Sequence, residues 1–175
     1  MTRASHVWNG IPWPDGTVAE RIALLDGSAP LAFAAFASLG EEASPEVERA
    51  LVTHVGSPDW RKRRAACEAL GGARRAASAV EAVSLRLEDP SFYVVAAACR
   101  ALGRLGGPEL GERLVRVLGS ADEGSRLAAV EALDASSGAQ AFAPLLRVLR
   151  EDTSVPVRRR AGFALRRHAS AETWH

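Results

Sequence analysis

The sequence predicts an all-α protein, a right-handed solenoid of about five helical hairpins stacked one on the next. Leucine recurs at intervals of 31 or 32 residues, each time with a small residue directly before it and an alanine four positions before it. A second apolar column follows 12 or 13 residues later. Alanine and leucine supply most of the apolar residues, and aromatic residues make up only 6% of the chain, which favours closely packed helices over sheets.

The first column marks the first helix of each hairpin, which we name helix A. Residues four apart lie on one helical face, so each alanine lies beside its leucine. The alanine lets neighbouring helix backbones approach closely, and the leucine fills the remaining space. The leucines of this column are Leu39, Leu70, Leu102, Leu133 and Leu165.

The second column marks the other helix of each hairpin, which we name helix B. Each of its members is followed four positions later by another aliphatic residue, which again gives one apolar face. Because one such hairpin cannot bury its own apolar surface, we expect stability to come from the stacking of neighbours. The paired positions are Leu51 with Val55, Val83 with Leu87, Leu114 with Leu118, and Leu145 with Leu149.

Turn and capping residues separate the predicted helices. An aspartate or serine precedes helix A in three repeats, where its side chain can cap the helix, and Ser44-Pro45 opens a helix B with proline in its first turn. A glycine follows the helix-A leucine in three repeats, where we expect a left-handed residue that ends the helix. The predicted capping residues are Asp59, Ser91 and Asp122, and the glycines are Gly40, Gly71 and Gly103.

The two ends depart from the repeat. Residues 1–16 form an aromatic arm, which we interpret as folding onto the first repeat, with a partner contact as the alternative. The pattern of residues 17–25 predicts a single helix of the B type before the first complete hairpin. Only ten residues follow Leu165, too few for a helix B, so apolar surface would stay open at this end. We expect a single domain over residues 17–175, with repeats at about 28–56, 57–88, 89–119, 120–150 and 151–175.

The charge of the chain is balanced overall but unevenly placed. The net charge of +1 indicates neither nucleic acid nor membrane as a partner. Residues 1–56 hold three arginines against seven acidic residues, whereas residues 57–175 hold nineteen basic residues against fourteen acidic ones. No apolar leader segment or membrane-spanning stretch is visible, and two cysteines indicate a reducing compartment. We therefore interpret the protein as cytoplasmic.

The sequence shows no constellation that predicts catalysis or metal binding. The four histidines lie in different segments, and no pair has the spacing of a helical metal site. Cys67 and Cys99 occupy the same repeat position as Phe36, Val130 and Gly162, so we interpret both cysteines as buried packing residues. We expect no enzymatic activity, no catalytic residue, no cofactor and no bound metal.

Two repeats share a longer motif, which runs from a loop into helix A. Its matches are Asp89-Pro90, Val94, Ala97-Ala98 and Leu102-Gly103 in one repeat, and Val157-Arg158, Ala161 and Leu165 in another. These residues resemble the HEAT repeats of the phycobilisome-lyase-like class, a group of bacterial α-solenoids with an armadillo/HEAT-like superhelix. The resemblance covers about residues 28–168. It implies that motif arginines bond to aspartates of neighbouring repeats, which assigns a structural role to Arg63, Arg126 and Arg158.

These observations favour a non-catalytic protein-binding scaffold or adaptor that uses either a concave face lined by helix B or the ends of the solenoid. The expected partner is another protein with an acidic surface. The oligomeric state is open, and no membrane is expected. The candidate partner-binding residues are Arg113, Arg116 and Arg147 on helix B, Arg159 and Arg166 at the C-terminal end, and Trp8 and Trp13 in the arm.

Two alternative functions remain open. The first is a nucleic-acid-binding HEAT-like protein that uses the arginine-rich C-terminal half, which could contact phosphates but offers few aromatic side chains for base stacking. The second is a lyase-type chaperone subunit, which would need a bilin and a partner subunit.

Overall fold

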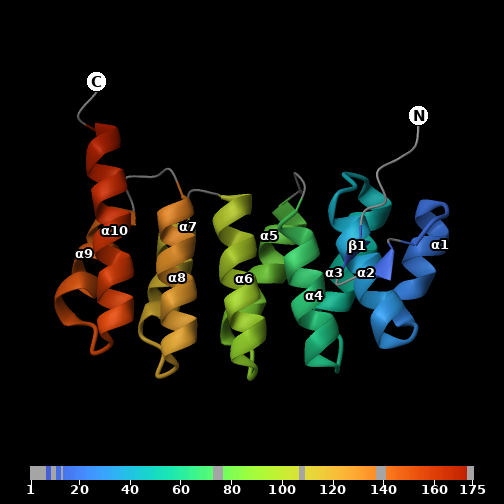
Figure 1. The fold of residues 1–175 in the computed structure, drawn as a ribbon, viewed down its shortest axis with the longest axis horizontal. Coiled ribbons are helices and arrows are strands. Elements are labelled where there is room, and N and C mark those ends of the chain that lie inside the picture. The colour runs from blue at the N-terminus through green and yellow to red at the C-terminus, as the bar shows by residue number, and fades with distance from the viewer. Residues whose placement is uncertain are drawn as a thin grey trace. The chain divides into compact units, whose positions relative to one another are not determined.

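The computed structural model describes residues 7–8, 11–12, 14–72, 77–106, 109–136 and 141–172, and within these ranges the side chains from residue 14 to residue 168. Its helices confirm the predicted all-α solenoid of helical hairpins (Figure 1). The A helices are α2 (Ala29–Gly40), α4 (Trp60–Leu70), α6 (Phe92–Leu105), α8 (Glu123–Ala135) and α10 (Val155–Glu172). The B helices are α3 (Pro45–Val55), α5 (Ala77–Ser84), α7 (Leu110–Leu118) and α9 (Phe142–Glu151).

Shorter elements accompany these helices. Helix α1 (Val18–Ala23) precedes α2, and 3-10 turns follow α1 at Leu24–Asp26 (η1) and α5 at Leu85–Glu88 (η2). Two strands, β1 (Val7–Trp8) and β2 (Ile11–Pro12), pair antiparallel in the arm.

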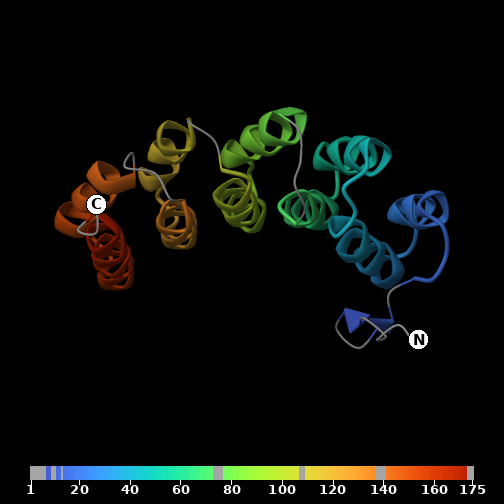
Figure 2. The same ribbon diagram turned by 90° about the horizontal axis from the view of Figure 1, so that it is seen from above.

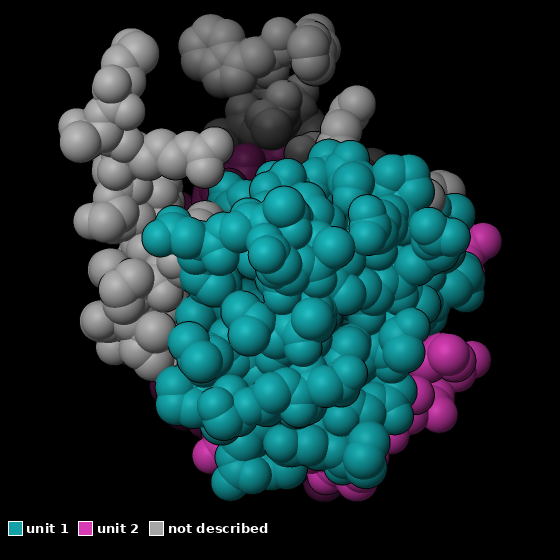
Figure 3. All heavy atoms as spheres, turned by 90° about the vertical axis from the view of Figure 1, so that its right-hand side faces the viewer, with its two compact units in different colours: residues 1–83 teal, residues 84–175 magenta. Residues whose placement is uncertain are grey.

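The chain forms two compact units, residues 1–83 and residues 84–175 (Figure 3). The predicted single domain over residues 17–175 and its repeat boundaries stay predictions. In both units the helix-A leucines are buried, so the column of Leu39, Leu70, Leu102, Leu133 and Leu165 forms the core as expected.

The first unit is covered at its N-terminal end. Thr17 and Glu20 form a capping box at the start of α1, because the Glu20 N–H donates to the Thr17 hydroxyl and the Thr17 N–H donates to the Glu20 carboxylate. The lone α1 leads into η1, which contacts α2 and contains the fully buried Leu25. The strands β1 and β2 also contact α2. The described part of this end presents a filled, rounded surface in Figure 3.

The second unit consists of two rows of helices, α6, α8 and α10 in one and α7 and α9 in the other (Figure 2). Contacts between successive A helices are far more extensive than those between α7 and α9. This packing corrects the expectation that B helices line a concave face. The concave side of a curved stack is the side on which helices lie closest, and in residues 84–175 that row consists of A helices.

The structure also corrects the role predicted for the repeated glycines. Gly103 lies inside α6 and Gly40 is the last residue of α2, and neither has the left-handed conformation expected of a helix-ending residue. Gly71 does follow the last residue of α4, as predicted, but in a right-handed conformation. A Cβ on Gly103 would lie 2.9 Å from the Cα of Ala132, and one on Gly40 would lie 3.1 Å from the Cα of Ala69. The glycines are therefore required because the next A helix crosses at very short range.

The predicted caps are present at most helix starts. Asp59 accepts a hydrogen bond from the Arg61 N–H, Asp122 from the Ser125 N–H, and Ser44 from the Val47 N–H. Ser91 precedes α6 without a capping bond from its side chain.

Candidate functional site

The end of the second unit carries an open groove between α9 and α10, and we name it the end-face groove. Its apolar lining consists of Leu149, Val155 and Phe163 around Gly162. Three arginines, Arg158, Arg159 and Arg166, complete the described lining, and none of the described side chains that line it is acidic. The groove has a volume of about 390 Å³ and contains two of the seven predicted partner-binding residues, Arg159 and Arg166.

Helical periodicity explains why these residues meet. The α10 residues of the groove are spaced alternately three and one apart from position 155 to position 166, which places all of them on one helical face. Leu149 adds the last turn of α9. The apolar members are exposed to an unusual degree, since 57% of Val155 and 51% of Phe163 is accessible to solvent.

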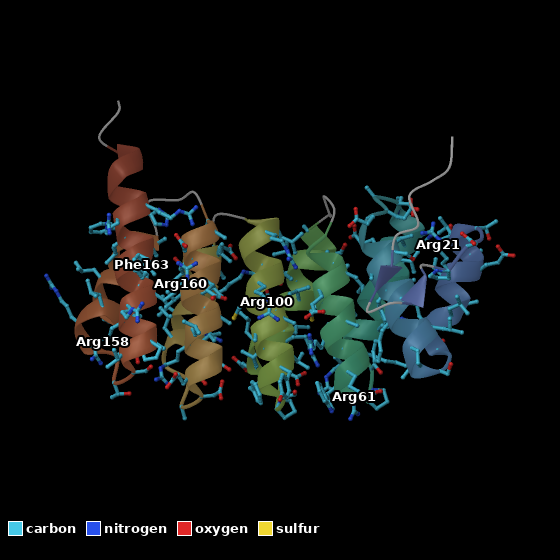
Figure 4. The ribbon with its side chains drawn as sticks, viewed as in Figure 1. Arg21, Arg61, Arg100, Arg158, Arg160 and Phe163 are labelled. Atoms are coloured by element: carbon cyan, nitrogen blue, oxygen red, sulfur yellow. The ribbon has the colours of Figure 1, made fainter. Side chains whose placement is uncertain are left out.

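The five arginines of α10 belong to two different sites, although they form one cluster in the sequence. Arg158 and Phe163 lie on the groove side of α10, whereas Arg160 lies on the side of α8 (Figure 4). Arg160 and Arg167 share one buried oxygen of Asp134, with nitrogen–oxygen distances of 2.7 and 3.0 Å. Arg160 also lies 3.9 Å from Glu131, so both guanidinium groups have acidic partners within the fold.

Asp134 is a residue whose importance sequence reasoning missed. It follows the helix-A leucine of its repeat, where Gly40, Gly71 and Gly103 stand in other repeats. Its buried side chain occupies the space that glycine leaves for a neighbouring helix elsewhere and links α8 to α10 through ion pairs. The departure from the glycine column was the available signal.

A recurrent arginine clamp fixes the loop before three A helices. One guanidinium nitrogen of Arg63, Arg126 or Arg158 donates to the carbonyls five and six residues before it, at distances of 2.7 to 3.1 Å. These bonds support the structural role that the resemblance implied. They also orient Arg158 so that its side chain borders the end-face groove.

Arg126 adds a link between neighbouring repeats, as the resemblance implied. Its Nε and Nη2 donate to both carboxylate oxygens of Asp152, at 2.9 and 3.1 Å. The same carboxylate accepts a bond from the Ser154 N–H, just before α10 begins. Hydrogen bonding from Arg126 is the main reason why the pKa of Asp152 lies below its usual value, and the bond to Asp152 raises the pKa of Arg126. This pair anchors the first turn of the helix that carries the groove.

The predicted arginines on the B helices do not join the groove. Arg113 donates to the Ser84 hydroxyl at 2.7 Å and pairs with Glu109 at 2.8 Å. Arg116 pairs with Glu88 at 3.2 Å, with both side chains largely exposed. Arg147 is exposed on α9. Because glutamates neutralise Arg113 and Arg116, the predicted basic stripe is weaker than the sequence indicates.

The two tryptophans proposed as partner contacts lie largely outside what the structure describes. The backbone of Trp8 belongs to β1, beside α2, in agreement with the interpretation that the arm folds onto the first repeat. The side chains of Trp8 and Trp13 lie outside the described residues, and their predicted role stays a prediction.

The cysteines have the packing role predicted for them. Cys67 and Cys99 are fully buried and form no disulfide. Burial raises the pKa of the Cys99 thiol to about 12, so this thiol stays protonated at neutral pH and is a poor nucleophile. Within the described residues no group of three or more histidine, cysteine or acidic side chains is arranged to hold a metal, and no helix is long and apolar enough to cross a membrane.

The match to a repeat family and one solved structure agree with this architecture. Residues 80–166 match the family model of HEAT repeats. An engineered protein of known crystal structure is 22% identical, with a TM-score of 0.56, over 87% of this chain and 79% of that chain. The complex of CpcE and CpcF of phycocyanin lyase from Nostoc sp. PCC7120 is 21% identical, with a TM-score of 0.38, over 86% of this chain and 82% of that chain. A comparison with curated proteins found no match. The chain is therefore an all-α solenoid whose residues 80–166 match the family model of HEAT repeats.

Proposed function

We propose that this protein is a non-catalytic scaffold that binds another protein through the end-face groove. HEAT repeats suggest a protein-interaction scaffold, and the groove supplies a specific surface for that role. The observation that carries the proposal is the combination of exposed aliphatic and aromatic side chains with arginines at one end of the second unit. Arginines, and aromatic side chains that fill pockets, contribute most of the binding energy at many protein interfaces.

The charge of the groove indicates the charge of the partner. Arg159 and Arg166 are exposed, and among the described residues neither has an ion-pair partner. An acidic surface would supply the missing counter-charges, and paired guanidinium and carboxylate groups form strong, directional bonds. The partner surface therefore carries carboxylates around an apolar centre.

A capture experiment with matched charge reversals tests this function. The wild-type protein, an Arg159→Glu/Arg166→Glu variant and an Arg147→Glu/Arg150→Glu variant are immobilised and exposed to lysate of the native host, and bound proteins are quantified by mass spectrometry. The control pair lies on α9, is also exposed and changes the net charge by the same amount.

The proposal requires a protein that the wild type and the α9 variant retain and that the groove variant loses, with the interaction then reproduced using the purified partner. Loss with the α9 variant alone would move the site to helix B, as the sequence suggested for Arg147. Retention by all three proteins, or salt-dependent binding of duplex DNA in place of a protein, contradicts the proposal.

A further inference from the structure

We infer that the end-face groove accepts an amphipathic helix of the partner, which inserts one apolar side chain beside Gly162 and places carboxylates at Arg159 and Arg166. This inference rests on the proposed scaffold function and specifies what the scaffold recognises. Three features of α10 support it: a glycine without a structural need, an arginine in a glycine column, and two arginines that have no ion-pair partner among the described residues.

Gly162 leaves a hollow in the end-face groove, although the packing of α10 does not require a glycine at this position. Among the described side chains, a Cβ at this position would meet only the Cδ1 of Leu149, at 3.5 Å, which is ordinary van der Waals contact. Glycine in a helix interior is unfavourable relative to alanine, so its presence here needs another reason. The equivalent positions in the inner repeats hold larger, buried side chains, namely Phe36, Cys67, Cys99 and Val130. Glycine therefore leaves room for a side chain that comes from outside the chain.

Arg166 makes a further repeat a poor match for the groove unless that repeat is acidic at the contact. It follows the helix-A leucine of its repeat, the position that Gly40 and Gly103 take where the next A helix crosses at very short range. The other charged residue in this column, Asp134, adjoins α10 because two arginines of α10 pair with it. By the same reasoning, a helix that packs against Arg166 needs carboxylates at this position.

The shape and charge of the groove favour a helix over a small ligand. Small-molecule sites bury most of their ligand, whereas this groove is open along α10. Its α10 residues span positions 155 to 166, which corresponds to about 16 Å of helix. A partner helix of about three turns matches this length, with apolar residues on the face that meets Phe163 and acidic residues toward Arg159 and Arg166.

A displayed peptide library provides a defined probe. Helical peptides of about 16 residues, long enough to span the three turns of the groove, are randomised along one face and selected against the full-length wild-type protein. Binding of the enriched peptides is then measured by fluorescence polarisation. The test variants are Gly162→Leu, which fills the hollow, and Arg159→Glu/Arg166→Glu, which reverses the charge. Gly162→Ala is the matched control, because it removes the glycine but leaves most of the hollow, and thermal unfolding checks that each variant is folded.

The inference predicts enriched sequences with an apolar anchor and at least two nearby acidic residues. Gly162→Leu and the arginine variant should each weaken binding about tenfold or more, and Gly162→Ala less than about threefold. Enrichment of sequences without acidic residues, failure to enrich any sequence, or equal binding by folded Gly162→Leu would overturn the inference.

The outcome also separates this inference from the proposed function. If the native partner needs Arg159 and Arg166 but binds folded Gly162→Leu as well as wild type, the scaffold function stands and the inserted side chain is refuted. If the arginine variant also binds the partner as well as wild type does, both proposals fail.

Discussion

Arg126→Ala tests the contact that fixes the start of α10. The substitution removes two hydrogen bonds to Asp152 and two to backbone carbonyls of the preceding loop. Only 12% of the Arg126 side chain and 5% of the Asp152 side chain is exposed, so the aspartate would remain as a buried charge without its main partner. Breaking a buried ion pair in this way lowers the free energy of unfolding by about 3–5 kcal/mol.

Arg158→Ala is the matched control for this substitution. Its guanidinium makes the same two bonds to loop carbonyls, at 2.7 and 3.0 Å, without a hydrogen bond to a carboxylate. Losing two such bonds costs about 1–3 kcal/mol, less than losing them together with the pair to Asp152. Urea denaturation followed by circular dichroism measures both variants, and a cycle that includes Asp152→Ala isolates the pairwise term. Equal losses for Arg126→Ala and Arg158→Ala, with no coupling to Asp152, would refute the reasoning.

The same pair predicts a pH dependence of defined sign. The pKa of Asp152 is lower in the folded protein than its usual value of 3.8 because Arg126 bonds to the ionised form. The stability from this shift is present above the unfolded pKa and is lost as the pH falls through the folded pKa. Wild type should therefore be more stable than Asp152→Asn at pH 7, and the difference should shrink below about pH 4. A difference in unfolding free energy that stays constant between pH 7 and pH 3 contradicts this account.

Four further predictions concern the core and one exposed ion pair. Gly103→Ala should destabilise the protein, because its Cβ would lie 2.9 Å from the Cα of Ala132, and thermal unfolding should show a lower midpoint. Leu102→Ala should cost about 2–5 kcal/mol through cavity formation. Arg116→Ala, which breaks an exposed ion pair, should change stability by less than about 1 kcal/mol in the same urea assay. Cys99 should not react with a thiol-specific dye at pH 8 until the protein unfolds, because burial raises the pKa of its thiol to about 12; rapid labelling of the native protein would contradict this.

Local periodicity made the repeat predictable, because the leucine and alanine columns depend only on which residues share a helical face. The glycines were harder to interpret. A glycine after a helix-A leucine can end a helix or lie inside it. Only the crossing of α6 and α8 shows that Gly103 allows these two helix backbones to approach each other closely. The prediction that B helices line a concave face was wrong in residues 84–175 for a similar reason. Curvature depends on which row of helices packs more closely, and this is not visible in the periodicity of a single helix.

The candidate site could be predicted only in part. Arg159 and Arg166 were identified from the charge of the C-terminal end, and both line the groove. Their separation from Arg160 and Arg167 was not anticipated, because it depends on the single substitution of aspartate for glycine at Asp134. The regular spacing of the groove residues along α10 was available in the sequence and would have indicated one shared face.

Amide chemical-shift mapping tests the central claim most directly. The isotope-labelled protein is titrated with the partner that depends on Arg159 and Arg166, and the perturbed residues are identified by NMR. The account predicts the largest changes at positions 155–166 of α10 and at Leu149, with α7 nearly unaffected. Changes concentrated on α7, with α10 unaffected, would contradict it.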